Sequence, residues 1–437
     1  MFMKRNIVKF KRLIAYIVCM FVLMSVNAQE VTVNGLKYYL FPETHEAVLN
    51  HMNEWQGELT IPSEISYNAN TYIVNGISIM AFTNCKELTK VRIPKTIDHV
   101  LHYLIGDGNG GFPTYYMNPF DGCSALEIIE VEEDNPIFKT VDGVLFNKDG
   151  TRLYCYPAGN KAETYVVPEP AVWIGEGAFG YNENLVAIEL PTIVEKLYSG
   201  FSGCTRLESV NLPDNLAVMN NGMFYNCHSL RSIDIPSGVT NMGGNIFQNC
   251  YSLESILLPE NISTIDDYAF YNCTSLKEIV LPSSLRVISG SLFANCCNLR
   301  AVTIQNGVTA VYDEAFKDCS SLKDLDLPAS ITYIGDDVFS GCKFDHLIIR
   351  GRLNYPSKYI FNGLDTSTPI YTIASQVEEL KKIYEGEVLP LEAYIDGIEQ
   401  IKRHQPSTHV FDLQGRRLND KPNKGVYIQN GKKLVIK

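Results

Sequence analysis

The chain has 437 residues, of which 46% are hydrophobic and 20% are charged, and its formal net charge at pH 7 is −12. This composition is typical of a folded protein with a large core and excludes a disordered chain. Basic residues gather near both ends, so residues 29–401 are more acidic than the whole chain, which argues against nucleic acid and anionic membranes as partners.

Residues 1–28 are predicted to form a secretory signal peptide. A basic stretch precedes the apolar run LIAYIVCMFVLM, and SVNA follows it up to Ala28. The apolar run is shorter than the roughly 20 residues that span a bilayer, which makes a membrane anchor the weaker interpretation. We therefore expect cleavage after Ala28 and a secreted or surface-held protein with no membrane insertion.

Residues 29–78 are predicted to form a β-structured N-terminal cap. Within VTVNGLKYYLF, Asn34 and Gly35 are a strong signal for a type I′ hairpin turn between two strands. The segments GELTIPSEI and NTYIVNGI look like further strands that lead to the first coil at Phe82. A cap is expected because the terminal coils of a repeat array expose apolar faces.

The central part of the chain, residues 79–350, is built from a repeat. Phenylalanine recurs every 23 residues, and from each one cysteine falls at +3, leucine at +6, valine or isoleucine at +9 and proline at +12. A period of this length is the mark of a leucine-rich-repeat solenoid. We predict an α/β repeat fold of about ten coils, with a parallel sheet on one side, a β-hairpin N-cap and a helical C-cap. The phenylalanines in register are Phe201, Phe224, Phe247, Phe270, Phe293, Phe316 and Phe339, with Phe82, Phe120 and Phe179 in similar units.

Two insertions interrupt the early coils, at 101–118 and 135–160. The first contains GDGNGG, which matches a dinucleotide-binding glycine pattern and begins like a calcium loop. No helix-forming sequence follows it, and the other calcium ligands are missing. The second insertion contains KDG between alternating segments, which predicts a hairpin.

Signatures of catalysis are missing from the sequence. It has no histidine pattern for zinc, no nucleophile elbow and no phosphate-binding loop, so we expect no enzymatic activity, no metal and no cofactor. A glycosidase-type carboxylate pair stays open among the many acidic residues, although such residues are more often a solvated face.

A binding face is predicted at the outward positions of the repeated strands. In KEIVLP, Ile279 and Leu281 point to one side and Glu278 and Val280 to the other, as in a strand. Residues at +8 and +10 should therefore stack as two exposed columns. The candidate ligand face comprises Ser209, Ser232, Ser255, Glu278, Ala301 and Asp324 in the first column, and Asn211, Asp234, Leu257, Val280, Thr303 and Asp326 in the second.

The predicted face is mixed and mostly small. It has a short apolar step at Leu257 and Val280 and no aromatic cluster, so a solvated sheet face remains the alternative. Tyr225 and Tyr271, each one residue after a repeat phenylalanine, form a second, convex candidate.

The regular cysteines are predicted to be structural thiols. Nine cysteines is an odd number, so they cannot all form disulfides with one another. The spacing between stacked coils, about 4.8 Å, also exceeds the ~3.5–4.5 Å that separates the β-carbons of a disulfide. In the coil of Phe179 the same slot holds Asn182, so we expect buried, reduced side chains with weak hydrogen bonds. The nine are Cys85, Cys123, Cys204, Cys227, Cys250, Cys273, Cys296, Cys319 and Cys342, and Cys19, Cys155 and Cys297 lie outside the register.

Residues 351–401 are predicted to form a C-terminal cap, in which ASQVEELKKIYE has apolar residues at helical spacing. Residues 402–437 form a basic tail, interpreted as a possible sorting signal or as a final hairpin packed on the cap.

The AF-x-x-C-x-x-L-x-x-V-x-L-P units resemble the BspA-like leucine-rich-repeat proteins of bacterial surfaces, as do the flanking segments NGLKYYLF, DGVLFNKDGTRLYCYP and IYTIASQVEELKKIY. The resemblance covers about residues 31–390 and implies export, surface display and attachment to proteins or glycans, including host matrix proteins such as fibronectin and fibrinogen. The tail from His409 to Lys437 resembles the C-terminal sorting tails of exported Bacteroidetes proteins. Two hypotheses follow: a non-enzymatic adhesin-like attachment protein, or a structural or accessory scaffold of the cell envelope without a host-binding role.

Overall fold

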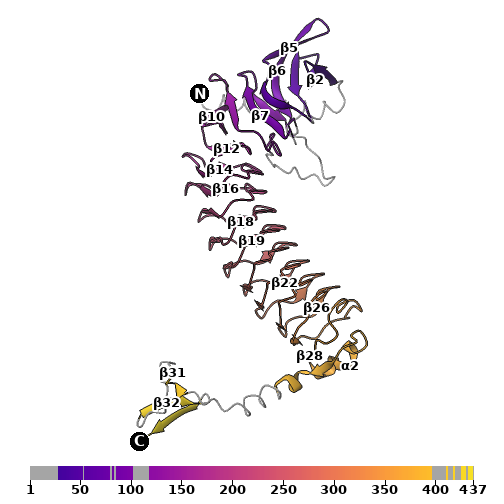
Figure 1. The fold of residues 1–437 in the computed structure, drawn as a ribbon. Helices are drawn as coiled ribbons and strands as arrows, with labels where there is room; N and C mark the ends of the chain where they lie inside the picture. The colour runs from indigo at the N-terminus through magenta and orange to yellow at the C-terminus, as the bar shows by residue number, and fades with distance from the viewer. Residues whose placement is uncertain are drawn as a thin grey trace, which may run out of the picture.

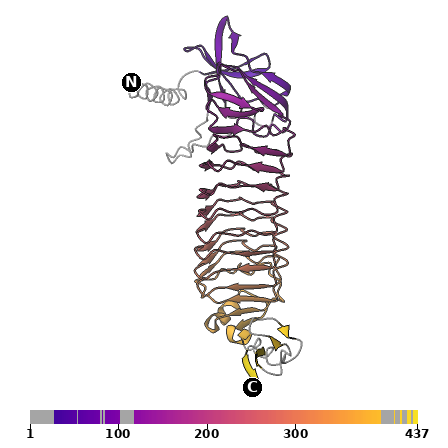
Figure 2. The same cartoon turned by 90° about the vertical axis from the view of Figure 1, so that its left-hand side faces the viewer.

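The computed structural model describes residues 28–52, 54–78, 81–82, 85–101 and 118–395, together with four short strands between 410 and 436. The solenoid forms an elongated rod of stacked coils, with the N-terminal sheet at one end and a short helical segment at the other (Figures 1 and 2). The predicted signal peptide and most of the 101–118 insertion, GDGNGG included, lie outside the described residues.

The N-terminal end begins with a hairpin of β1 (Gln29–Val33) and β2 (Leu36–Phe41). Asn34 and Gly35 have φ angles of 51° and 81°, the left-handed geometry that an Asn-Gly turn requires. The larger sheet runs in the order β1-β2-β3-β6-β5, with β8 pairing with β6, and a smaller parallel sheet runs β4-β7-β9. The other strands are β3 (Glu46–Leu49), β4 (Gln56–Thr60), β5 (Glu64–Tyr67), β6 (Asn70–Ser78), β7 (Glu87–Ile93), β8 (His99–Leu101) and β9 (Ile128–Val131).

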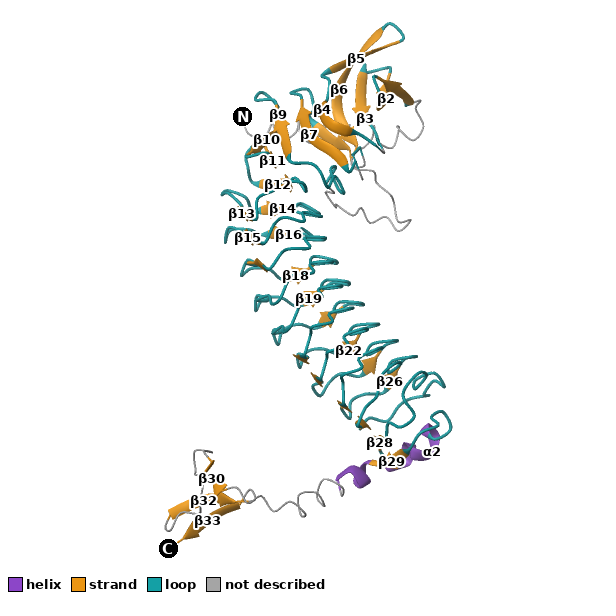
Figure 3. Cartoon of the chain, in the orientation of Figure 1, coloured by secondary structure: helices purple, strands orange, loops and turns teal. Residues whose placement is uncertain are grey.

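Two rows of short parallel strands run along the solenoid, one of them the predicted sheet and the other not predicted from the sequence. The first row contains the +8 to +10 positions, and the second contains the +17 and +18 positions (Figure 3). The first comprises β13 (Thr164–Val166), β15 (Ala187–Glu189), β17 (Ser209–Val210), β21 (Glu278–Val280), β23 (Ala301–Thr303), β25 (Asp324–Leu327), β27 (His346–Ile349), β28 (Ile370–Thr372) and β29 (Val388–Pro390). The second comprises β12 (Arg152–Cys155), β14 (Trp173–Ile174), β16 (Lys196–Leu197), β18 (Val218–Met219), β19 (Asn241–Met242), β20 (Thr264–Ile265), β22 (Val287–Ile288), β24 (Ala310–Val311) and β26 (Tyr333–Ile334).

Sequence analysis does not detect the second row because each of its strands except β12 is only two residues long. Such a strand has one outward and one inward residue, as in exposed Val218 and buried Met219. Two residues are too few to show the alternation that identifies a strand. The predicted sheet is therefore present, and the second row is an additional feature that the sequence analysis missed.

The repeat phenylalanines from Phe179 to Phe316 form a continuous stack in the core. Phe247, Phe270 and Phe293 are fully buried, and the centroids of neighbouring rings lie 5.6 Å apart in stacked geometry. Each of these phenylalanines also donates its backbone N–H to the next coil, as from Phe270 to Leu292 O at 3.0 Å. The coils are thus joined in the core by aromatic contact and at the surface by hydrogen bonds.

The chain turns sharply on both sides of each phenylalanine. The residue at +2 has a positive φ, for example 60° at Asn272 and 64° at Asn295, and the residue at −2 has one of 60° at Tyr268. Asparagine tolerates this conformation better than most residues, which explains its recurrence before the cysteine. The Asn272 side chain also donates to Asn249 Oδ1 at 2.8 Å, and Asn249 to Asn226 Oδ1 at 2.7 Å.

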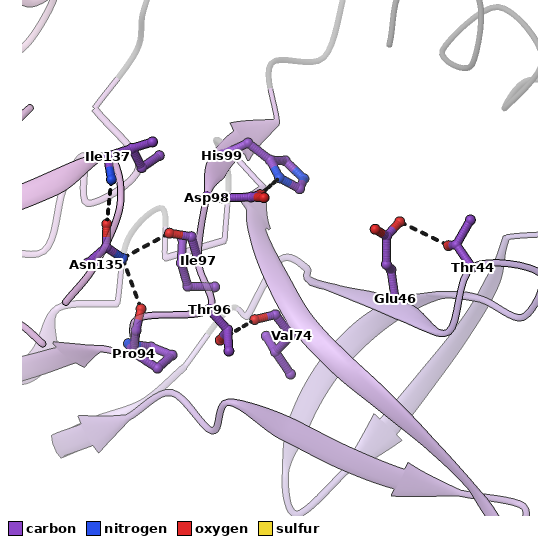
Figure 4. A network of polar contacts seen from close by, with 10 residues as sticks. All are labelled: Thr44, Glu46, Val74, Pro94, Thr96, Ile97, Asp98, His99, Asn135 and Ile137. Atoms are coloured by element: carbon purple, nitrogen blue, oxygen red, sulfur yellow. Dashed lines mark hydrogen bonds and ion pairs between the residues drawn. The ribbon is translucent and has the colours of Figure 1, made fainter. Parts of the chain in front are cut away.

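The segment 135–160 folds as antiparallel strands joined to the second row. β10 (Phe138–Val141) pairs with β11 (Val144–Asn147), and β11 pairs with β12 around the KDG turn. Buried Asn135 holds the start of the segment: its Nδ2 donates to Pro94 O at 3.0 Å and to Ile97 O at 2.8 Å, while its Oδ1 accepts from the next backbone N–H groups (Figure 4). Asn135 therefore joins the start of this segment to the chain that follows β7.

The C-terminal helical segment is shorter than its sequence pattern predicts. A 3₁₀ turn, η1 (Ala374–Gln376), leads into α2 (Val377–Leu380), and the chain then enters turns before β29. Val377 and Leu380 are buried, as the helical spacing requires, and residues 391–395 are again helical.

The tail contains an antiparallel sheet in the order β31-β30-β32-β33, with β30 (Val410–Phe411), β31 (Arg417–Leu418), β32 (Gly425–Gln429) and β33 (Lys432–Ile436). Its role as a sorting signal stays a prediction.

The nine register cysteines are unpaired and buried. Eight of the thiols donate to the carbonyl of the phenylalanine in the preceding coil, as from Cys273 Sγ to Phe247 O at 3.2 Å and from Cys296 Sγ to Phe270 O at 3.1 Å. The ninth, Cys85, donates to Met52 O at 3.0 Å. Burial raises the pKa of Cys204 and of Cys342 to about 12, so both stay protonated at neutral pH.

We expect a thiol label at pH 8 to modify Cys297 in the folded protein and none of the register cysteines. Cys297 is the exposed cysteine among the described residues, and the thiolate, which is the reactive form, is scarcely populated at a buried thiol of raised pKa. Mass spectrometry of residues 29–437 labelled with and without denaturant measures this. All eleven cysteines should react after denaturation, and register cysteines that stay unlabelled there would indicate disulfides.

Candidate binding face

The predicted ligand face lies on the outward side of the first strand row, and all twelve of its residues are exposed. Its columns are held in register by parallel pairing, with Glu278 opposite Ala301 and Val280 opposite Thr303. A β-bridge between Asp234 and Leu257 continues the row where the strands are interrupted. The structure therefore brings the predicted residues together on one continuous face.

An apolar step lies in the middle of the second column. The side chain of Leu257 is 87% exposed and that of neighbouring Val280 is 53% exposed. Val280 alternates with buried Ile279, so its exposure follows from the strand geometry of the coil.

Asn211 has a structural role on this face. Its Nδ2 donates to Leu190 O at 2.8 Å, and its Oδ1 accepts from Leu190 N at 2.7 Å. The side chain thereby replaces backbone pairing where β17 ends, which makes Asn211 less available to a ligand than the rest of its column.

A row of charged residues borders the ligand face at the +7 positions. Glu254 pairs with Lys277 at 2.6 Å and with Arg231 at 3.7 Å. The hydrogen bond from Lys277 lowers the pKa of Glu254, so this carboxylate stays charged well below neutral pH. The apolar step is therefore flanked by a charged border along the rod.

An aromatic and charged cluster lies at the C-terminal end of the same face, and sequence analysis missed it. Arg350 binds Asp326 through two hydrogen bonds of 2.7 Å, which raise the pKa of the guanidinium. Beside them, the rings of His346, Tyr371 and Tyr394 lie 5.0 to 6.0 Å apart. We name His346, Arg350, Tyr371 and Tyr394 the terminal cluster.

The terminal cluster was missed for a definable reason. Its members come from three segments that leave the 23-residue register, so column counting stops at Asp326. A usable signal existed in the strand-like segments around Ile348 and Tyr371, which pair in the structure.

The two tyrosines of the convex candidate have different surroundings. Tyr271 is half-buried and its ring contacts that of Tyr268, with centroids 5.8 Å apart. Tyr225 lines a pocket of about 380 Å³ that spans several coils on the side of the phenylalanine turns. The pocket also contains Glu176 and Tyr181, and we name it the turn-side pocket.

Two kinds of site were sought in the part of the chain that the structure describes: a cluster of metal ligands and a membrane-spanning helix. No group of three or more His, Cys, Asp and Glu residues there is arranged to hold a metal ion. No helix in the described ranges is both long and apolar enough to cross a bilayer.

Comparisons with known proteins agree with the solenoid architecture. A family model described as the BspA type leucine rich repeat region matches in six copies over residues 61–106, 153–261 and 240–368, which is more than half of the chain. A search of curated proteins gives no significant match.

Solved structures with a similar fold come from several bacteria. A leucine rich cell surface protein from Faecalibacterium prausnitzii A2-165 is 21% identical, with a TM-score of 0.50 over 84% of this chain and 100% of that one. A leucine-rich repeat protein from Bacteroides ovatus is 20% identical, with a TM-score of 0.45 over 82% of this chain and 99% of that one. A third, from Eubacterium ventriosum, is 22% identical with a TM-score of 0.43; the match covers 65% of this chain and 64% of that one, less than two thirds of its length.

Proposed function

Because the chain belongs to the family of BspA-type leucine-rich-repeat proteins, we propose that it is a non-enzymatic attachment protein, exported by its signal peptide and displayed at the cell surface, that binds a partner protein through the ligand face. One observation carries this proposal: a continuous exposed column contains the apolar step at Leu257 and Val280 and ends in the terminal cluster. Neither feature is needed to close the solenoid core.

The chemistry of the face suits a protein partner. Binding hot spots are enriched in tyrosine and arginine, which the terminal cluster supplies in Tyr371, Tyr394 and Arg350. An exposed leucine beside a valine offers apolar area that gains free energy when a partner covers it, at about 25 cal/mol per Å².

The dimensions of the face also suit a protein partner. Leu257 and Tyr371 are five coils apart, which at about 4.8 Å per coil is roughly 24 Å. That is the scale of a standard protein interface of about 800 Å² per partner.

We expect the double substitution L257D/V280D to weaken binding of residues 29–437 to an immobilised matrix protein by at least about tenfold. Two carboxylates would then have to be desolvated where apolar contact is expected. Fibronectin and fibrinogen, the ligands that the family resemblance implies, serve as probes in biolayer interferometry, with a glycan array as a second arm.

The matched control for this experiment is V218D. Val218 is 45% exposed on the second strand row, so its substitution adds a charge of the same kind on another side of the rod. Equal losses with V218D and L257D/V280D would place binding elsewhere. A chain that binds neither probe while remaining folded would favour the envelope-scaffold hypothesis.

A further inference from the structure

The turn-side pocket carries features that the ligand face does not explain. It is a cavity of about 380 Å³ between the phenylalanine turns of neighbouring coils, and no lysine or arginine lines it. Its charged residues are Asp121 and Glu176, and tyrosine side chains contribute to its wall at Tyr181 and Tyr225.

One oxygen of the Glu176 carboxylate has no hydrogen-bond partner. Its Oε2 is buried and accepts no hydrogen bond. Burial raises the pKa of Glu176, and the nearby charge of Asp121 raises it further. Burial likewise raises the pKa of Asp121. Two partly buried carboxylates therefore line one pocket, and a positive charge bound between them would stabilise their ionised forms.

The wall of the pocket is fixed before any ligand arrives. Asn118 donates its Nδ2 to Gly177 O at 3.2 Å, and its Oδ1 accepts from Phe120 N at 2.9 Å. Asn221 Oδ1 accepts from Gly244 N at 2.9 Å. These side chains have partners within the protein, whereas the inner oxygen of Glu176 has none.

Tyr181 is positioned by a glycine in the next coil. A β-carbon on Gly203 would lie 2.7 Å from Tyr181 Cδ1, so the ring packs directly against that backbone. Gly203 has a φ of 77°, which glycine adopts without strain. An aromatic ring held beside two carboxylates is a favourable setting for a cation, because the ring face attracts positive charge.

We propose that the turn-side pocket binds a guanidinium or primary ammonium group, with Glu176 and Asp121 as its anionic partners and Tyr181 and Tyr225 as its aromatic wall. Such a group can be an arginine or lysine side chain of a partner protein or part of a free small molecule. This site lies on another side of the rod from the ligand face and does not depend on the function proposed for it.

The test uses folded residues 29–437 in low-salt buffer at pH 7.5. Agmatine and the blocked peptide acetyl-Gly-Arg-Gly-amide are titrated by isothermal calorimetry, with the citrulline peptide as the neutral isostere. We expect both cations to bind and the citrulline peptide to bind at least about tenfold more weakly. Tighter binding of the peptide than of agmatine would indicate a protein side chain as the natural occupant, and the reverse a free small molecule.

Two variants connect binding to the pocket. E176Q and D121N should each weaken cation binding at least about tenfold, while E183Q, which alters an exposed carboxylate of the same coil, should not. E176Q should unfold at the same or a higher temperature than the parent protein, because it removes a buried charge without a partner. Measuring both variants keeps the test decisive if one of them fails to fold.

The proposal is wrong if the folded protein binds neither cation at millimolar concentration, or if the citrulline peptide binds as well as the arginine peptide. Unchanged cation binding in both E176Q and D121N would overturn it as well. Loss of matrix-protein binding in L257D/V280D has no bearing on these outcomes, so the two proposals fail independently.

Discussion

We expect the substitution Phe270→Ala to lower the free energy of unfolding by about 3–5 kcal/mol, the range measured for large aromatic residues removed from a protein core. Phe270 is fully buried, and its ring stacks on Phe247 and Phe293 at 5.6 Å on both sides. The substitution leaves a cavity and removes two aromatic contacts together. Urea denaturation followed by circular dichroism measures the loss.

The solenoid architecture adds a second expectation for this variant. Coils in a repeat array are stabilised mainly by their neighbours, so a weak coil in the middle uncouples the two halves. Phe270→Ala should therefore broaden or split the unfolding transition. Val280→Ala alters an exposed residue of the same coil and should change stability by no more than about 0.5 kcal/mol. A change below about 1 kcal/mol for Phe270→Ala would show that the stack is not a major source of stability.

The second large effect is expected at Asn182, the residue that occupies the cysteine slot in the coil of Phe179. Its Nδ2 donates to Pro157 O at 3.2 Å, and its Oδ1 accepts from Asn184 N at 2.9 Å and Leu185 N at 2.8 Å. Asn182→Ala leaves these buried groups without partners, each at a cost of about 1–3 kcal/mol. We expect a total loss of about 3 kcal/mol in the free energy of unfolding.

The variant Asn182→Cys tests whether stability at this position depends on filling the space or on the hydrogen bonds of the side chain. Cysteine fits the slot in the neighbouring coil, where Cys204 Sγ donates to Phe179 O at 3.1 Å, but it offers no strong acceptor for the Asn184 and Leu185 amides. Its stability should therefore lie between those of the parent protein and Asn182→Ala. Asn261→Ala, at an exposed position, is the control and should be nearly neutral. Equal stability of Asn182→Ala and the parent would mean that water satisfies the same groups.

The ligand face and the turn-side pocket differ in how far they could be predicted. Residues of the ligand face follow from the alternation of the strand, since Glu278 and Val280 must point outward when Ile279 is buried. The role of Asn211 did not follow, because its hydrogen bonds to Leu190 reach into the preceding coil. Sequence analysis marked Tyr225 as a candidate but could not associate it with Glu176, which lies 49 positions earlier in the chain.

The amino-acid sequence by itself determined the solenoid, its inward positions and the buried state of the regular cysteines. In a repeat array each residue contacts its equivalents in the adjacent coils, so the period alone specifies the neighbours of Phe270 and Cys273. Only the tertiary structure shows which residues come together where the 23-residue period is interrupted and where neighbouring coils meet at a turn. The second strand row, the terminal cluster around Tyr394 and the meeting of Asp121 and Glu176 in one pocket all depend on the path of the backbone, which no spacing in the sequence encodes.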